Sequence, residues 1–187
     1  MRLARRTALG VLGAALMPVH AQARKLTIAA ASDLRFALDE AMRAFRAVHA
    51  DARIEVVYGS SGKLATQIRH GAPFDVFLSA DREFADALHR DGFAAGAPRL
   101  YARGHLVAWS TDASLGRLPL ADLVRDARVQ RFAIANPEHA PYGRRAVEAL
   151  RSQGQWDAVQ PKLVLGENIA QAVQFVQTGA AQAGLVA

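Results

Sequence analysis

Short apolar runs alternate along the chain with segments in which apolar residues recur every three or four positions. Six runs have the length and composition of buried strands: residues 26–31, 54–58, 76–78, 132–135, 163–165 and 185–187. Helical patterns follow the first five of these runs: residues 34–48, 64–69, 83–90, 142–153 and 169–178. Because strands that alternate with helices form mostly parallel sheets covered by helices, the pattern predicts an α/β fold.

A change of amino-acid composition near the middle of the chain predicts two lobes. Residues 92–98 are mainly glycine, alanine and proline, and residues 100–110 have the pattern of one or two extended segments. We therefore expect a first lobe over residues 24–100 and a second over residues 101–187. The apolar positions of residues 34–48 have the spacing of a helix that packs one face against the first sheet.

The N-terminal residues have the pattern of a signal peptide. Three arginines precede an apolar run over residues 7–19, and Ala21-Gln22-Ala23 has the small-residue pattern of a cleavage site. We expect residues 1–23 to be removed and the mature chain to begin at Arg24 in the periplasm. The apolar run is shorter than the roughly 20 residues that a spanning helix needs.

Composition excludes several classes of function. The sequence has no cysteine, which rules out disulfides and thiolate metal sites. The net charge of +6 becomes +3 once the three arginines of residues 1–23 are set aside. The remaining basic residues are scattered among acidic ones, so the sequence does not favour nucleic-acid binding. The histidines have no metal-ligand spacing, and we expect no metal site formed by side chains.

Four predicted strands lead into a turn of small residues at a helix start. These junctions are Ala30-Ala31-Ser32-Asp33, Gly59-Ser60-Ser61-Gly62, Ala140-Pro141-Tyr142-Gly143 and Gly166-Glu167-Asn168-Ile169. The first turn of a helix has free backbone N–H groups and partial positive charge. Ligands of open α/β sheets bind beyond the carboxyl ends of the strands. Two junctions from each lobe therefore predict an anion site in the cleft, where the serines either cap their helices or face the ligand.

The sequence supports an enzymatic function less well than an anion-binding one. Ser60-Ser61-Gly62-Lys63 matches the S-x-x-K pattern of serine acyl enzymes, but the motifs that accompany it are absent. The same glycines do not complete a phosphate-binding loop. His139 adjoins one of the turns, where it either approaches the cleft or is a solvated loop residue. Asp81 has the position of a helix N-cap rather than of a general acid or base.

Five segments carry a resemblance to a known family. They are residues 29–32, Gly59 to Ile68, Gly71 to Asp81, Asn136 to Gly143 and Gly166 to Gln171. In these segments the chain resembles the molybdate-binding periplasmic proteins of ABC importers, over nearly all of its mature length. The resemblance implies a two-lobed, type II periplasmic binding protein that binds molybdate or tungstate and delivers it to a membrane permease. It also implies a monomer with no cofactor and no enzymatic activity.

The resemblance also implies which residues bind the oxyanion. It assigns hydroxyl donors to Ser32 and Ser61 and backbone donors to Tyr142 and Ile169. Ser60 is a possible further donor, and so are the backbone groups of Ala31 and Gly143. Some family members have a tyrosine at the position of Ala187, which has no hydroxyl.

Family members also continue past this position. We therefore expect the return crossing and the C-terminal part of the first lobe to be absent, which would leave apolar surface uncovered. Two alternatives stay open at this point. One is a receptor for another anion such as sulfate or phosphate, and the other is a serine acyl-transfer enzyme that uses Ser60 and Lys63.

Overall fold

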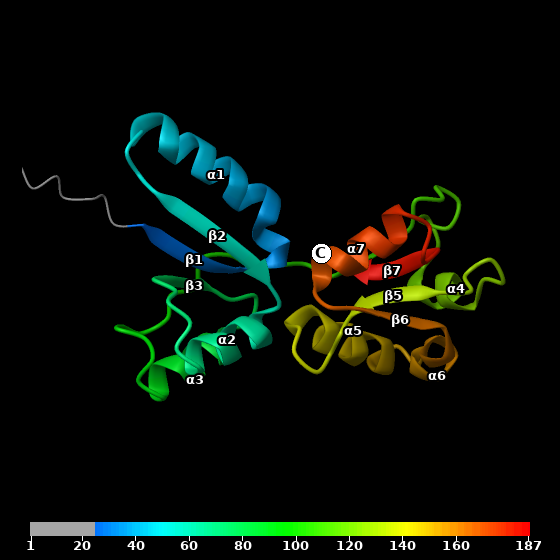
Figure 1. Cartoon of the computed structure of the whole chain (residues 1–187). Coiled ribbons are helices and arrows are strands. Elements are labelled where there is room, and N and C mark those ends of the chain that lie inside the picture. Colours follow the sequence, from blue (N-terminus) through cyan, green and yellow to red (C-terminus); the bar gives the residue numbers. More distant parts are fainter. Residues whose placement is uncertain (1–24) are drawn as a thin grey trace, which may run out of the picture.

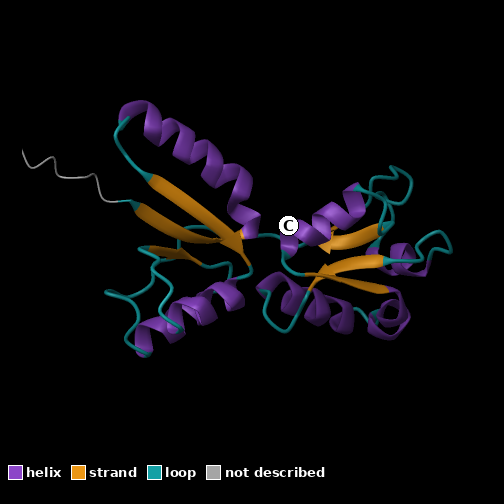
Figure 2. Ribbon diagram, viewed as in Figure 1, coloured by secondary structure: helices purple, strands orange, loops and turns teal. Residues whose placement is uncertain are grey.

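The computed structural model describes residues 25–187, which form two α/β lobes lying side by side (Figure 1). The predicted signal peptide lies outside the described residues. Both lobes contain parallel strands followed by helices, as the alternating pattern predicted, and helices lie on both sides of each sheet (Figure 2). Within residues 25–187, no helix combines the length and the apolar character needed to cross a membrane.

The first lobe contains a parallel three-stranded sheet in the order β2-β1-β3. Its strands are β1 (Leu26–Ala31), β2 (Ile54–Gly59) and β3 (Val76–Leu78). Ala31 pairs with Gly59 in this register, so the first two predicted junctions leave the sheet next to each other.

Helices follow each of these strands. A short 3-10 helix, η1 (Ser32–Leu34), leads into α1 (Arg35–Val48), and α2 (Ser61–Arg69) packs against α3 (Arg82–Arg90). The helical prediction for α1 is confirmed. The predicted face is only partly covered: Leu38 and Met42 are half-buried, but α1 has no fully buried residue. Phe36 and Val48, which lie outside that face, are 83% and 78% exposed.

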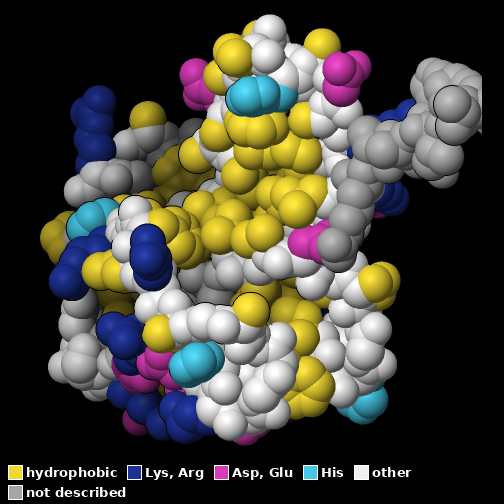
Figure 3. Space-filling model, turned by 90° about the vertical axis from the view of Figure 1, so that its left-hand side faces the viewer, with side chains coloured by type: hydrophobic (Ala, Val, Ile, Leu, Met, Phe, Trp, Pro, Cys, Tyr) yellow, Lys and Arg dark blue, Asp and Glu magenta, His cyan; other side chains and the backbone are white. Residues whose placement is uncertain are grey.

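Polar contacts join α1 to β2. Arg46 Nη2 donates a hydrogen bond to the Ile54 carbonyl over 2.7 Å, and the Tyr58 hydroxyl donates to Asp39 Oδ1 over 2.6 Å. Hydrophobic side chains form a broad exposed area on the face of the first lobe that points away from the second lobe (Figure 3). The expectation of uncovered apolar surface is therefore met in the first lobe.

A crossing over residues 91–106 contains neither helix nor strand and leads into the second lobe. The predicted lobe boundary at residue 100 falls within it. The second sheet has the order β4-β7-β5-β6, and β4 is antiparallel to β7 while the other pairs are parallel. Its strands are β4 (Val107–Trp109), β5 (Phe132–Ala135), β6 (Leu163–Gly166) and β7 (Ala183–Val186).

The helices of the second lobe enclose a continuous core. They are α4 (Leu120–Arg125), α5 (Pro141–Ser152), α6 (Trp156–Val159), the 3-10 helix η2 (Gln160–Lys162) and α7 (Ile169–Gln177). Phe132 and Ile134 of β5 are fully buried, and α5 and α7 pack against this strand. The two apolar clusters of the described residues both belong to this lobe.

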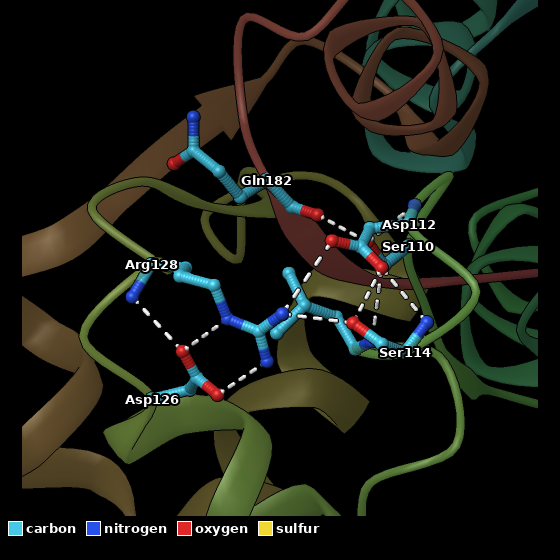
Figure 4. A network of polar contacts seen from close by, with 7 residues as sticks. Ser110, Asp112, Ser114, Asp126, Arg128 and Gln182 are labelled. Atoms are coloured by element: carbon cyan, nitrogen blue, oxygen red, sulfur yellow. Dashed lines mark hydrogen bonds and ion pairs between the residues drawn. The ribbon is translucent and has the colours of Figure 1, made fainter.

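A polar network fixes the loop between β4 and α4 (Figure 4). The guanidinium of Arg128 donates to Asp126 at 2.7 and 2.9 Å and to the Ser114 hydroxyl at 2.8 Å. These bonds from Arg128 lower the pKa of Asp126 to about 2. The pKa of Asp112 is also lowered, mainly by the hydroxyl and the backbone N–H of Ser114. The network therefore stabilises this loop through ionised carboxylates.

Candidate anion-binding site

The carboxyl ends of the parallel strands in both lobes face the boundary between the lobes (Figure 1). All four predicted junctions lie at this boundary. Three of them supply most of the wall of a small cavity, and the fourth supplies Ile169. The cavity is lined by Ala31, Ser32, Asp33, Gly59, Ser60, Ser61, Ala80, Ala140, Pro141, Tyr142 and Ile169. The predicted convergence of the junctions is therefore present in the structure.

Three buried serines lie in the cavity wall, and none of them caps its own helix. Ser61 is fully buried, and Ser32 and Ser60 are each 4% exposed. The Ser61 hydroxyl oxygen accepts a hydrogen bond from the Ala80 N–H over 3.0 Å. The Ser32 oxygen accepts one from the Ala170 N–H of the other lobe over 3.4 Å. Since both oxygens act as acceptors, both hydroxyl hydrogens remain able to donate to a ligand.

Backbone donors are also available at the cavity. Among residues 25–187, no hydrogen-bond acceptor is found for the N–H groups of Ser61, Tyr142 and Ile169. Each of these residues lies in the first turn of a helix, where such N–H groups have no partner within the helix. Three first turns therefore present partial positive charge and free donors to one small space.

Ser60 and His139 connect the two lobes. The Ser60 hydroxyl lies 2.9 Å from His139 Nδ1, and the Gly62 N–H donates to the His139 carbonyl over 3.0 Å. His139 is thus a half-buried turn residue that reaches the lobe boundary through Ser60, although it does not itself line the small cavity. Ser60 lines the cavity but also takes part in this contact between lobes.

Ion pairs across the boundary surround the cavity. Lys63 of the first lobe pairs with Glu167 of the second. Arg144 Nη1 donates to Glu83 Oε2 over 3.1 Å, and the second-lobe Arg145 lies 3.4 Å from Asp81. Lys63 therefore has a carboxylate partner in the other lobe, which argues against its use as the base of an acyl enzyme.

The predicted N-cap role of Asp81 is confirmed. Asp81 Oδ1 accepts a hydrogen bond from the Glu83 N–H over 2.9 Å at the start of α3. This carboxylate therefore has a structural partner rather than a role in acid–base chemistry.

Asp33 also lies in the cavity wall, although we assigned it no role from the sequence. Its Oδ2 accepts a hydrogen bond from the Tyr142 hydroxyl over 3.0 Å, and its Oδ1 is buried with no partner among the described residues. Burial raises the pKa of Asp33, and the bond from Tyr142 partly opposes that rise. The only signal for Asp33 in the sequence is its position directly after Ser32.

Burial and the charge of Asp33 also change the pKa values of two nearby tyrosines. Burial raises the pKa of Tyr142, and the charge of Asp33 raises it further. Burial also raises the pKa of Tyr101 to about 12, again with a contribution from the Asp33 charge. Both phenols therefore stay protonated at neutral pH, so each hydroxyl can donate a hydrogen bond.

Ala187 does not line the small cavity, but it borders an opening that shares Ser32, Asp33 and Ile169 with it. This larger opening has a volume of about 500 Å³ and lies between the start of α1 and α7. The small cavity has no lysine or arginine in its wall. No group of three histidine, aspartate or glutamate side chains suited to a metal ion occurs in the described part of the chain.

Comparison with known proteins gives one consistent result. Residues 26–187 match the family model of bacterial extracellular solute-binding proteins. The molybdate-binding protein ModA of Rhodobacter capsulatus is 41% identical over 135 residues, which cover 72% of this chain and 53% of that protein. ModA of Azotobacter vinelandii is 38% identical over 177 residues, which cover 94% of this chain and 69% of that protein.

A solved structure confirms the predicted architecture. The periplasmic molybdate-binding protein of Azotobacter vinelandii matches with a TM-score of 0.79 and 31% identity, over 87% of this chain and 71% of that one. The fold is therefore that of a two-lobed periplasmic binding protein. The chain spans about half of the length of the Rhodobacter relative and about two thirds of the Azotobacter one.

Proposed function

The chain belongs to the bacterial extracellular solute-binding proteins, and within them to the molybdate-binding proteins, and we propose that it binds molybdate between its two lobes. In this proposal the hydroxyls of Ser32 and Ser61 and the backbone N–H groups of Tyr142 and Ile169 donate hydrogen bonds to the oxyanion. Ser60 contributes through the lobe contact with His139. Tungstate, which is also a tetrahedral dianion, is bound in the same way.

One observation carries the proposal: two buried serine hydroxyls and three free helix N–H groups converge on a cavity with no cationic side chain in its wall. A dianion that leaves water loses strong hydrogen bonds, and fixed donors must replace them. Neutral donors do this without the fixed positive charge that would attract many other anions. The donor set therefore fits an oxyanion whose oxygens are all unprotonated.

Fixed donors would also allow discrimination by size. Sulfate and phosphate are smaller than molybdate, so their oxygens would leave some of the fixed donors without a partner, at roughly 1–3 kcal/mol for each. Protonated phosphate would also place an O–H against a donor. A receptor for sulfate or phosphate is the alternative within the same architecture, and competition experiments separate the two.

The proposal includes a place in transport. The relatives' names and the predicted signal peptide support a periplasmic binding protein. We propose that it works as a monomer with the permease of an ABC importer. Closure of the two lobes around the anion would give the permease a surface that differs between the empty and loaded states. We propose no acyl-transfer step, since Lys63 is paired with Glu167. The proposal needs no cofactor.

Titration calorimetry with molybdate, tungstate, sulfate and phosphate tests the proposal. We expect binding of molybdate and tungstate with one site per chain, and no displacement of molybdate by sulfate at a comparable concentration. Displacement at comparable concentration would favour the alternative receptor. Stable labelling of Ser60 by an acylating probe would instead support the enzyme.

A further inference from the structure

A hydrogen bond between a tyrosine and a carboxylate crosses from one lobe to the other at the cavity wall. The Tyr142 hydroxyl, on α5 of the second lobe, donates to Asp33 Oδ2 of the first lobe over 3.0 Å. We propose that this pair is a closure latch, whose two side chains stabilise the closed arrangement of the lobes. Asp33 and Tyr142 are then positioning residues through their side chains, in addition to the backbone donor at Tyr142.

Asp33 cannot act as a donor to the anion while it is ionised. A carboxylate only accepts hydrogen bonds, and its charge would repel a dianion in the same cavity. Burial of a carboxylate is costly unless it is hydrogen-bonded. Tyr142 is the residue whose side chain meets that need, since it forms the one side-chain hydrogen bond that lowers the pKa of Asp33. The carboxylate therefore has its partner in the opposite lobe.

The crossing between the lobes also holds the Tyr142 hydroxyl in place. A Cβ atom added to Gly104 would lie 1.8 Å from the hydroxyl oxygen of Tyr142. The oxygen thus packs directly on the backbone of the crossing, which only glycine permits at this position. First lobe, second lobe and crossing meet at one hydroxyl, so a movement that separates α5 from the start of α1 breaks the bond to Asp33.

The expected change in molybdate dissociation rests on the proposed function. The expected change in the distance between the lobes of the ligand-free protein rests on geometry alone. A bond that exists only in the closed form raises the closed fraction, and the apparent affinity rises with that fraction. A hydrogen bond to a charged group is strong enough to change the ratio of closed to open protein about tenfold. We expect the effect on the ligand mainly in its dissociation rate.

Tyr142→Phe is the central variant, because it removes the hydroxyl and leaves the backbone N–H for the anion. The chain has no cysteine, so spin labels can be placed at Arg90→Cys and Gln153→Cys, on exposed positions of the two lobes. Pulsed electron resonance then measures the distance between the lobes. In the ligand-free protein we expect the distribution of distances between the labels to be broader for Tyr142→Phe, with a longer mean, than for the labelled protein that keeps Tyr142. With molybdate we expect dissociation about tenfold faster.

The chain offers a matched control and a second disrupting variant. Tyr58 donates to Asp39 over 2.6 Å within the first lobe, so Tyr58→Phe removes a similar bond that does not cross the boundary. We expect Tyr58→Phe to leave the lobe distances and the dissociation rate unchanged. Gly104→Ala should act like Tyr142→Phe, because the added methyl displaces the hydroxyl.

A double-mutant cycle separates the latch from the charge of Asp33. Asp33→Ala removes the acceptor and also a charge that repels the anion, so its own effect on affinity combines two contributions. In the Asp33→Ala background, Tyr142→Phe should have no further effect on lobe distances. Asp33→Asn should retain the closed distances, because its amide oxygen can accept the same bond.

Two outcomes would overturn the latch. The first is an unchanged ligand-free distance distribution in Tyr142→Phe. The second is an equal effect of Tyr142→Phe with and without Asp33. If the unmodified protein fails to bind molybdate, the proposed function fails, and the ligand-free distances alone then decide the latch.

Discussion

Replacing Ser61 by alanine removes one of the donors that we assign to the oxyanion. Ser61 is fully buried, and its oxygen already accepts the Ala80 N–H over 3.0 Å, so its hydrogen is free to point into the cavity. A hydrogen bond to a charged partner contributes about 1.5–3 kcal/mol. We therefore expect Ser61→Ala to weaken molybdate binding by roughly 10-fold to 150-fold.

The same substitution has a smaller effect on stability. It leaves the Ala80 N–H without its acceptor, and loss of a neutral hydrogen bond costs about 1 kcal/mol. For a chain of this size that corresponds to a fall of roughly 2–4 °C in the melting temperature. Calorimetric titration and thermal unfolding of the same preparation measure the two effects separately.

Ser110 provides a matched control in the second lobe. It is 7% exposed and donates to the Gln182 carbonyl over 2.6 Å, away from the cavity. Ser110→Ala should therefore lower the melting temperature and leave molybdate affinity unchanged. If Ser61→Ala is folded and binds molybdate as tightly as the unmodified protein, Ser61 is not a ligand and the assigned donor set is wrong.

Two further predictions concern lobe closure and acid stability. Gly62→Ala should hinder closure and weaken binding, because the added Cβ would lie 2.5 Å from the His139 carbonyl of the other lobe; binding titrations of Gly62→Ala that match the unmodified protein would contradict this. The lowered pKa values of Asp112 and Asp126 contribute stability above the ordinary value of 3.8 that is lost as pH falls through the folded values, about 2 for Asp126. Arg128→Ala should flatten this acid limb in denaturant unfolding between roughly pH 4 and pH 2, and an unchanged pH profile would refute the role of the network.

The strands and long helices were predictable because their apolar residues are regularly patterned, whether or not those residues are buried. The short apolar runs of β1, β3 and β5 coincide with strands in the structure. The helices α4 and α6 were not predicted, since segments of 6 and 4 residues are too short to show a helical period. For α1 the period indicated an apolar face correctly, but a period does not reveal what covers that face.

The helix starts and the serines of the candidate site were predictable, but the side-chain pairings between the lobes were not. Helix starts after parallel strands are local features, and topology alone brings them to one boundary. The bond from Tyr142 to Asp33 joins residues 109 positions apart, and the contact of Ser60 with His139 joins residues 79 positions apart. No local pattern specifies such pairings, so Asp33 was missed. The assignment of Ser32, Ser61, Tyr142 and Ile169 as ligands stays a prediction.

Because the apolar core is unevenly distributed between the lobes, we expect the two lobes to unfold separately on heating. Both apolar clusters lie in the second lobe, whereas the buried apolar residues of the first lobe are mainly the alanines of β1 with Ile28, Leu64 and Leu88. Amide protons of β5 should therefore exchange with solvent far more slowly than those of β1 or β2. The second lobe is then the more rigid of the two. The first lobe, with little apolar core of its own, depends for its order on contacts with other surfaces.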